Sequence, residues 1–362
     1  MDDAIARLRL IRTPSIGPVS YRQLVRRFGS AAAAIDALPD LARAGGGVPP
    51  VVPPPAHAER EQAMLARVGA RHLFLDDADY PPLLARADNA PVILTLRGDI
   101  ALATRTPVAM VGARNASAAA CRFARQMAQA LAERGATVVS GLARGIDTAA
   151  HHGALPATIA VIAGGIDTLY PPENDELQER IAHEGLLIAE MPPGTQARAR
   201  HFPHRNRIIA ALSLGTVVVE AAPRSGSLIT ARLAGEAGRE VMAVPGHPSD
   251  PRAQGCNALI RDGATLVQDA DDVWEQVRPI DARALHSGAV RSPAAGWGAP
   301  PPEDATDAER RTIERLLGPV PVAVDELVRQ SALAPAVVQM ILLELELAAR
   351  LERHAGGRVS LC

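Results

Sequence analysis

The sequence predicts an α/β protein with an extended, Rossmann-like, doubly wound and mostly parallel sheet, flanked by two small domains. In the middle of the chain, six short apolar runs rich in β-branched residues alternate with longer helical runs. The short runs are apolar throughout, as strands buried on both faces of a parallel sheet are. The predicted strands cover residues 107–112, 136–141, 158–165, 185–190, 215–221 and 240–246.

Two segments rich in Gly and Pro divide the 362-residue chain, and their composition is typical of linkers. The first 45 residues predict short helices joined by a turn at Ile16, Gly17 and Pro18, as in helix-hairpin-helix DNA binders. The tail predicts three helices and a hairpin turned by Gly356 and Gly357, which is a winged-helix layout. The predicted domains are a helical domain (1–45, helix-hairpin-helix or SAM-like), a linker (46–56), a Rossmann-like domain (57–278), a linker (279–304) and a winged-helix domain (305–362).

The two terminal domains differ in charge. Residues 1–45 carry seven Arg against four Asp, so DNA contact and simple packing on the sheet are both open for this domain. The predicted third helix of the tail, 335–349, carries Glu344 and Glu346 and no Arg. A helix that reads the major groove needs donors that reach base edges. We therefore interpret the winged-helix domain as a protein-interaction or accessory module.

The charge of the chain excludes a protein that coats nucleic acid through bulk charge. The formal net charge is −2, and all 38 basic residues are Arg. A chain without Lys has no Walker A lysine, no Schiff-base lysine and no pyridoxal-phosphate anchor. Phosphate recognition must therefore come from Arg side chains, backbone N–H groups and helix N-termini.

Cysteine usage and the start of the chain indicate the compartment. The three Cys are scattered, so we expect neither a disulfide framework nor a metal site, and we expect no cofactor. The start, MDDAIARL, lacks the charged-then-apolar pattern of a signal peptide, and no apolar run approaches the roughly 18 residues of a membrane helix. These features predict a cytoplasmic protein that does not enter a membrane.

Small and polar residues follow several predicted strands, where each strand turns into a helix. The carboxyl ends of parallel strands meet at one edge of the sheet, which is where ligands bind in such folds. Backbone N–H groups of these loops, together with the helix N-termini, are suited to an anion such as phosphate. The candidate residues in these loops are Gly112, Ala113, Arg114, Ser140, Gly141, Arg144, Ser225 and Gly226.

A second candidate group lies in the stretch HFPHRNR, residues 201–207. No acidic residue occurs between Glu190 and Glu220, although residues 101–278 are neutral as a whole. A basic groove with an aromatic ring suits single-stranded nucleic acid, because bases stack on the ring and Arg contacts phosphate. The alternative for the aromatic residue is a Phe that packs beneath a helix. The candidates here are Phe202, His204, Arg205, Asn206 and Arg207.

Two of these candidates are expected to differ in role. Arg205 and Arg207 are two residues apart at the start of a helix, so their side chains point to different sides. We expect one of them to face the ligand and the other to hold the fold.

Six motifs occur in order along the middle segment and together resemble the DNA-processing protein A family (DprA/Smf). The similarity extends from about residue 72 to about residue 278, through VGARNAS, SGLARGIDTAAH, TIAVIAGGIDTLYPPEN, FPHRNRIIAALS, SGSLITARLAGEAGREVMAVPG and GCNALIRDGA. The resemblance implies a protein without catalytic activity that binds single-stranded DNA during natural transformation and recombination. It also implies a homodimer that displaces single-strand-binding protein and loads the RecA recombinase.

The resemblance also implies roles for particular residues. The phosphate pocket would involve Gly112, Arg114, Ser140, Gly141 and Arg144, and the FPHRNR motif would supply Phe202, Arg205, Asn206 and Arg207. Ala113 departs from the pattern, because relatives commonly have Ser or Thr there and this chain lacks that hydroxyl. His204 is a candidate replacement for a lysine of relatives, which would make its DNA contact sensitive to pH.

An enzyme is the alternative function. Phosphoribohydrolases resembling lysine decarboxylases carry a P-G-G-x-G-T-x-x-E pattern, whose Glu works on a ribosyl bond. LGTVVVEA supplies Gly215, Thr216 and Glu220 at one residue wider spacing, but the preceding P-G-G is absent. A dinucleotide-dependent oxidoreductase is disfavoured because VGARNA lacks G-x-G-x-x-G.

Overall fold

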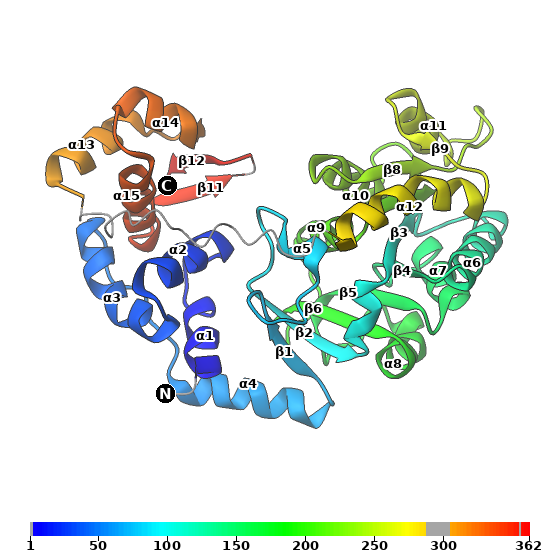
Figure 1. Ribbon diagram of the computed structural model, residues 1–362, viewed down its shortest axis with the longest axis horizontal. Coiled ribbons are helices and arrows are strands. Elements are labelled where there is room, and N and C mark those ends of the chain that lie inside the picture. Colours follow the sequence, from blue (N-terminus) through cyan, green and yellow to red (C-terminus); the bar gives the residue numbers. More distant parts are fainter. Residues whose placement is uncertain (1–2, 287–304, 355) are drawn as a thin grey trace. The chain divides into compact units, whose positions relative to one another are not determined.

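The computed structural model describes residues 3–286, 305–354 and 356–362, and these form two compact units. One unit consists of the N-terminal and C-terminal parts of the chain, up to Arg60 and from Val290 onward, and the other runs from Glu61 to Ala289. Figure 1 traces the elements of both units along the chain. The larger unit is built around one sheet, and the smaller unit pairs the two ends of the chain.

The sheet of the larger unit has nine strands among the described residues, in the order β1-β2-β6-β5-β4-β3-β7-β8-β9. The strands from β6 to β9 in that order are parallel, whereas β2 is antiparallel to both β1 and β6. All six predicted strands are confirmed within a few residues. The strands are β1 (Arg71–Phe74), β2 (Ile93–Gly98), β3 (Thr106–Gly112), β4 (Ala136–Ser140), β5 (Thr158–Gly165), β6 (Leu186–Met191), β7 (Gly215–Val219), β8 (Glu240–Ala243) and β9 (Thr265–Leu266).

Helices cover both faces of this sheet, which is why its central strands are apolar on both sides. Alternate residues of β3 and β4 enter separate hydrophobic clusters, one beneath α6, α7 and α12 and the other beneath α9 and α10. A third cluster packs α8 against β5 and β6. The helices are α4 (Pro55–Arg67), α5 (Pro82–Ala85), α6 (Ala118–Glu133), α7 (Ile146–Ala154), α8 (Asp175–Glu184), α9 (His201–Leu212), α10 (Gly226–Glu236), α11 (Gln254–Arg261) and α12 (Ala270–His286).

The strand order reverses between β3 and β7. The chain moves from β3 through β4 and β5 to β6 in one direction, then returns so that β7 pairs with the other side of β3. The loops that leave β3 and β7 therefore diverge to opposite faces and leave a crevice between them. This is the position at which an open parallel sheet binds ligands, so the topology predicts where the site lies.

The smaller unit contains the predicted helical domain and the predicted winged-helix domain. The first comprises α1 (Asp3–Ile11), α2 (Pro18–Phe28) and α3 (Ala31–Ala44). The second comprises α13 (Asp307–Leu316), β10 (Val322–Ala323), α14 (Val324–Ser331), α15 (Pro335–Leu347), β11 (Leu351–His354) and β12 (Arg358–Leu361). Thr306 forms a capping box with Glu309 at the start of α13, and the three strands order as β10-β12-β11. The expected winged-helix fold is confirmed.

Both predicted linkers differ in part from the structure. Gly45 to Gly47, at the start of the first Gly/Pro-rich segment, pack closely against α15 and Ala348, a contact between residues far apart that composition cannot reveal. α12 continues to His286 and therefore extends into the second predicted linker, which begins at residue 279. The remainder of that linker, 287–304, lies outside the described residues.

Apolar helices in this chain serve packing. Among the described residues, no single helix is long and apolar enough to cross a membrane. The bent pair of α14 and α15 meets the criteria of length and composition when taken together. α15 is largely buried within the smaller unit.

His151 is a buried group whose ionisation opposes folding. Its Nδ1 lies 2.7 Å from Thr158 Oγ1, and that hydroxyl donates to the carbonyl of Val138. His151 Nδ1–H is therefore the donor, and Nε2 is buried without a partner among the described residues. Burial lowers the pKa of His151 from 6.5 to about 3, with smaller contributions from His152 and Arg205.

We expect the free energy of unfolding to depend on pH through His151. The unfolded chain binds a proton at this residue below pH 6.5, whereas the folded chain does not until about pH 3. The stability that neutral His151 contributes to the folded state is therefore fully present above pH 6.5. As the pH falls towards 3, the free energy of unfolding decreases by about 1.4 kcal/mol per pH unit through this residue. Urea unfolding of the wild type and of His151→Gln, from about pH 7 to about pH 4, measures this. Parallel pH profiles for the two proteins would contradict it.

Candidate nucleic-acid interface

The crevice between the loops after β3 and β7 is a cavity of about 760 Å³, called here the larger cavity. Its walls come from residues 111–115 after β3, from the start of α9, and from residues 222–230, which include the first turns of α10. A smaller cavity of about 210 Å³ adjoins it, over the carboxyl ends of β4 and β5. The residues shared by both linings are Arg114, Ala143, Tyr170, Ala197 and Phe202.

A stack of three side chains lies where the two cavities meet. The Arg114 guanidinium lies 4.9 Å from the centroid of the Phe202 ring. The Tyr170 ring also contacts Phe202, with the two ring centroids 5.6 Å apart and the planes tilted by 51°. Phe202 therefore lies in the wall of both cavities. It is not a core residue packed beneath a helix, the alternative considered from the sequence. The stack combines a cation with aromatic faces, as proteins that bind unpaired bases do.

Arg205 holds this region together from inside. Its Nη1 donates to the carbonyl oxygen of Gly141, directly after β4, and to that of Val161, within β5. The side chain is buried, and burial lowers the pKa of Arg205 to about 10, so it remains charged at neutral pH. A Cβ at Gly141 would lie 2.6 Å from Arg205 Nη1, so the guanidinium requires glycine at that position.

Asp147 complements this buried charge. One of its oxygens, Oδ2, accepts hydrogen bonds from the backbone N–H groups of Gly141 and Ala143, at 3.2 and 3.3 Å. Burial raises the pKa of Asp147, and the positive charge of Arg205 and those two N–H groups oppose the increase. Asp147 lines the larger cavity, but its Oδ2 is engaged by the two backbone N–H groups, so it orders the loop after β4 as a capping carboxylate does.

Arg207 lies apart from both cavities. Its Nη2 forms an ion pair with Glu190, and its Nη1 donates to the carbonyl of Asn89 at 2.7 Å. His204 is half-exposed and contacts the same carboxylate, with Nε2 3.2 Å from Oε2 of Glu190. Burial alone would raise the pKa of Glu190, but the hydrogen bond from His204 and the charge of Arg207 lower it. Arg205 and Arg207 are both buried, but Arg205 is among the residues that line the larger cavity, whereas Arg207 is in neither lining. That one of the two faces the ligand stays a prediction.

Some of the remaining predicted residues line the cavities, and others form the buried frame, meaning the side chains that hold the strands and loops around the cavities in place. Ser140 belongs to the frame, because it is buried and its hydroxyl donates to the carbonyl of Met110 at 2.6 Å. Ser225 caps α10 by accepting from Ser227 N–H. Arg144 lies at the mouth of the smaller cavity, 3.4 Å from Glu173. The larger cavity is lined by the predicted residues Gly112, Ala113, Arg114, Phe202, Arg205, Asn206, Ser225 and Gly226.

Several residues near this site are not among the predicted site residues, although Arg198 and Arg200 belong to the basic stretch between Glu190 and Glu220. Tyr170 was quoted within a motif but not singled out, although an aromatic residue in a loop after a strand was a usable signal. Arg198 and Arg200 precede α9, and Arg224 follows β7; all three are exposed. Arg114 and Arg224 line the larger cavity, whereas Arg198 and Arg200 are in neither lining and lie in the segment before α9. None of these four guanidinium groups pairs with a carboxylate among residues 3–278 and the described part of the tail.

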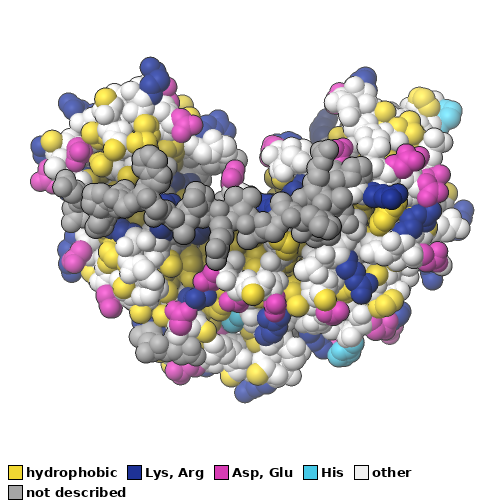
Figure 2. Space-filling model, in the orientation of Figure 1, with side chains coloured by type: hydrophobic (Ala, Val, Ile, Leu, Met, Phe, Trp, Pro, Cys, Tyr) yellow, Lys and Arg dark blue, Asp and Glu magenta, His cyan; other side chains and the backbone are white. Residues whose placement is uncertain are grey.

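Positive charge is local, as the net charge requires. On the face drawn in Figure 2, Arg side chains and carboxylates are interspersed, and neither sign covers a large continuous area. A phosphate ligand must therefore be recognised by a small set of guanidinium groups and by backbone N–H groups at the carboxyl end of the sheet.

Glu220, the residue on which the enzyme alternative depends, has a structural role here. Its Oε2 accepts from Ser117 N–H at 2.7 Å, at the start of α6, and Arg252 lies 3.4 Å from its Oε1. Its own carbonyl accepts from Ala113 N–H at 2.7 Å. The backbone of Glu220 is left-handed, with φ of 54°, a strained conformation that these contacts maintain. The carboxylate is outside both cavity linings, so the geometry disfavours a catalytic acid at this position.

We expect substitutions of Arg205 and Arg114 to differ in their effect on the free energy of unfolding. Arg205→Ala removes a buried guanidinium and its hydrogen bonds to two carbonyls, and should lower the free energy of unfolding by about 3 kcal/mol. Arg114→Ala removes an exposed side chain and should change it by no more than about 0.5 kcal/mol. Urea unfolding at neutral pH measures both. Equal losses in the two variants would show that Arg205 does not have this framing role.

Comparisons with known proteins agree with this architecture. The sequence model of a family described as DNA recombination-mediator protein A matches residues 71–278. Models of a DprA-like N-terminal HHH domain and a DprA winged helix domain match residues 1–63 and 298–357. Protein Smf of Synechocystis is 35% identical over 314 residues, covering 78% of each chain. The DNA processing protein DprA of Streptococcus pneumoniae is 46% identical over 203 residues, covering 55% of this chain and 71% of that one.

Solved structures show the same similarity. The X-ray structure of DNA processing protein A from Streptococcus pneumoniae superposes with a TM-score of 0.62 at 35% identity, covering 75% of this chain and 96% of that one. DNA processing protein A of Helicobacter pylori, whose structure concerns its single-stranded DNA binding mode, gives a TM-score of 0.53 at 28% identity and covers 58% of this chain and 96% of that one. With three domain matches in order and relatives aligned over most of its length, this chain belongs to the DprA/Smf family of DNA-processing proteins.

Proposed function

We propose that this protein binds single-stranded DNA in the larger cavity and acts without catalysis in DNA recombination. The observation that carries this proposal is the Arg114–Phe202–Tyr170 stack at the strand-order reversal of the sheet. The face of an unpaired base is free to stack on an aromatic ring, whereas the bases of a duplex are stacked on one another. The stack therefore favours a single strand. The solved relative from Helicobacter pylori, with its single-stranded DNA binding mode, supports the same ligand.

The phosphates would be held by exposed guanidinium groups that have no carboxylate partner among the described residues, and by backbone N–H groups. Arg114 and Arg224 are exposed and line the larger cavity, and the exposed Arg198 and Arg200 lie in the segment before α9, next in sequence to the lining residues Ala197 and Ala199. The N-terminus of α10, opened by Ser225 and Gly226, adds backbone N–H groups on the wall formed by the loop after β7. Arg205 and Arg207 take part indirectly, because each fixes the position of α9 and hence of Phe202.

Equilibrium binding to a labelled oligothymidine, single-stranded against duplex, tests the proposal over a salt series of about 50 to about 300 mM. We expect a salt-sensitive preference for the single strand. Arg114→Ala should weaken binding and reduce the slope of log K against log salt by up to about 0.7, the value for one phosphate on a single strand. Phe202→Ala should weaken binding by about 1–3 kcal/mol and leave the slope nearly unchanged.

Arg122→Ala is the matched control, because Arg122 is an exposed arginine of α6 outside both cavity linings. It should change neither affinity nor slope. Binding of duplex as tight as that of the single strand, or equal effects of Arg114→Ala and Arg122→Ala, would overturn the proposed interface.

Family membership supports a wider role. We propose that the protein works in the cytoplasm as a homodimer that displaces single-strand-binding protein and loads RecA, during the uptake of DNA by natural transformation. RecA ATP hydrolysis on a strand coated with single-strand-binding protein is the readout. The wild type should restore RecA ATP hydrolysis on the coated strand, and Arg114→Ala should not. If the wild type binds single-stranded DNA but does not restore RecA ATP hydrolysis, the RecA-loading role is rejected while the proposed DNA binding stands.

A further inference from the structure

The helix that many winged-helix domains present to DNA is enclosed in this protein. α14 and α15 form the helix-turn-helix, with an angle of 120° between them, and α15 occupies the position of the recognition helix. Its buried residues point in every direction around the helix, whereas a recognition helix leaves one face open. The buried residues of α15 are Val338, Met340, Ile341, Leu342, Leu343, Glu344, Leu345 and Leu347.

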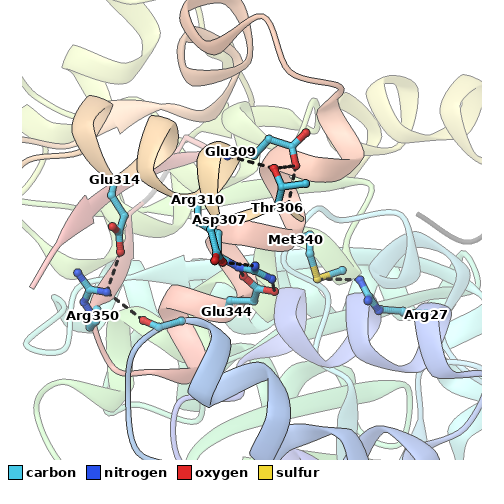
Figure 3. Close-up of polar contacts among 10 residues, drawn as sticks. Arg27, Thr306, Asp307, Glu309, Arg310, Glu314, Met340, Glu344 and Arg350 are labelled. Atoms are coloured by element: carbon cyan, nitrogen blue, oxygen red, sulfur yellow. Dashed lines mark hydrogen bonds and ion pairs between the residues drawn. The ribbon is translucent and has the colours of Figure 1, made fainter. Parts of the chain in front are cut away.

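The N-terminal domain covers α15. Gln23 Nε2 of α2 donates to Gln339 Oε1 at 2.8 Å, and Arg27 Nη1 lies 2.8 Å from the Met340 sulfur. α3 packs alongside α15. Beyond the end of α15, Arg350 Nη1 donates to the carbonyl of Gly45 at 3.0 Å and pairs with Glu314 at 2.8 Å (Figure 3). Gly45 and Arg350 are 305 positions apart in the sequence, so this contact joins the two ends of the chain.

Two glycines allow this close approach. A Cβ at Gly45 would lie 2.1 Å from the carbonyl oxygen of Glu344, and a Cβ at Gly47 would lie 2.5 Å from Cα of Ala348. Both obstacles are backbone atoms, which cannot move aside as a flexible side chain can. The segment after α3 therefore fits against the end of α15 only because it has no side chains there.

The charge of α15 also argues against DNA reading. The helix, PAVVQMILLELEL, contains no Arg, Lys or His. Its two carboxylates are paired within the winged-helix domain: Glu344 accepts from Arg310 at 2.8 and 2.9 Å, and Glu346 accepts from Arg353 at 2.8 Å (Figure 3 draws the first pair). A major-groove helix needs side-chain donors on an open face. The side-chain donor of α15 is the amide of Gln339, which contacts Gln23 of the N-terminal domain, and most residues from Val338 to Leu347 are buried.

We propose that the winged-helix domain is the docking surface for the N-terminal domain of the same chain, and not a reader of duplex DNA. The surface consists of α15, Ala348 and Arg350, and its occupant is α2, α3 and the segment Gly45 to Gly47. The two terminal domains are then one cooperative module, in which a change on either side loosens the other.

Hydrogen exchange of the full-length protein, measured by mass spectrometry, tests the coupling. Gly47→Ala forces a methyl group against Ala348, whereas Gly318→Ala makes the same change in the winged-helix domain at a position with nothing within 4 Å of the new Cβ. With Gly47→Ala, we expect exchange in α15 and α3 to accelerate together, by roughly tenfold or more, because both lose a packed face. Gly318→Ala should leave both unchanged, and α6 of the larger unit is the internal reference.

The reciprocal variant keeps the test decisive if Gly47→Ala folds poorly. Arg350→Ala removes the donor to Gly45 from the winged-helix side, and it should accelerate exchange in α3 as well as near the substitution. Acceleration confined to the altered domain, in either variant, would overturn the proposal, because it would show two independent domains.

Covalent closure tests the second half of the proposal. Cys residues at Gln23 and Gln339, in a chain with Cys121→Ser and Cys362→Ser, can be joined by a short bis-maleimide across the 2.8 Å side-chain contact. We expect the closed protein to bind duplex DNA as the unlinked protein does, within about twofold. A loss of duplex binding on closure would show that an opened α15 reads DNA and would reject the inference.

Discussion

The crevice depends on one buried cation. The Arg205 guanidinium binds the carbonyl oxygens of Gly141 and Val161, and so attaches α9 to β4 and β5 at the edge of the sheet where the cavities lie. Phe202 is one turn earlier on the same helix, and this attachment fixes where its ring faces. The carbonyls, Asp147 and the glycine at position 141 are arranged around that charge, because a buried guanidinium without partners would be too costly to keep.

Arginine has two distinct roles in this protein, and burial separates them. Arg205 and Arg207 direct their planar donors to carbonyls and a carboxylate inside the fold, a geometry that a lysine ammonium could not reproduce. Arg114, Arg198, Arg200 and Arg224 remain at the surface without carboxylate partners among the described residues. A chain of formal charge −2 thus keeps a few exposed guanidinium groups without carboxylate partners among the described residues, as the proposed phosphate contacts require.

Tight backbone contacts recur wherever distant segments meet. Glu220 adopts a left-handed backbone at the end of β7 and connects the loops on both sides of the strand-order reversal. Gly45 and Gly47 make the corresponding contact between the two ends of the chain. At Glu220, hydrogen bonds hold a residue in a strained backbone conformation. At Gly45 and Gly47, the absence of side chains lets the end of α15 approach the backbone closely. Both devices shape a binding surface, one for the proposed DNA strand and one for the protein's own domain.

The sequence by itself determined the fold class, the six central strands, the winged helix and the family. Those features depend on hydrophobic periodicity and on motifs that are local in the chain, such as the apolar runs and FPHRNR. The tertiary structure decided which arginines are available to a ligand, since Arg205, Arg207 and Arg114 are chemically identical and differ only in what surrounds them. It also decided that Glu220 caps α6 and that Gly45 to Gly47 pack on α15, because the partners in each contact are separated by about a hundred to about three hundred residues. Such pairings arise only when the chain has folded, and no local pattern encodes them.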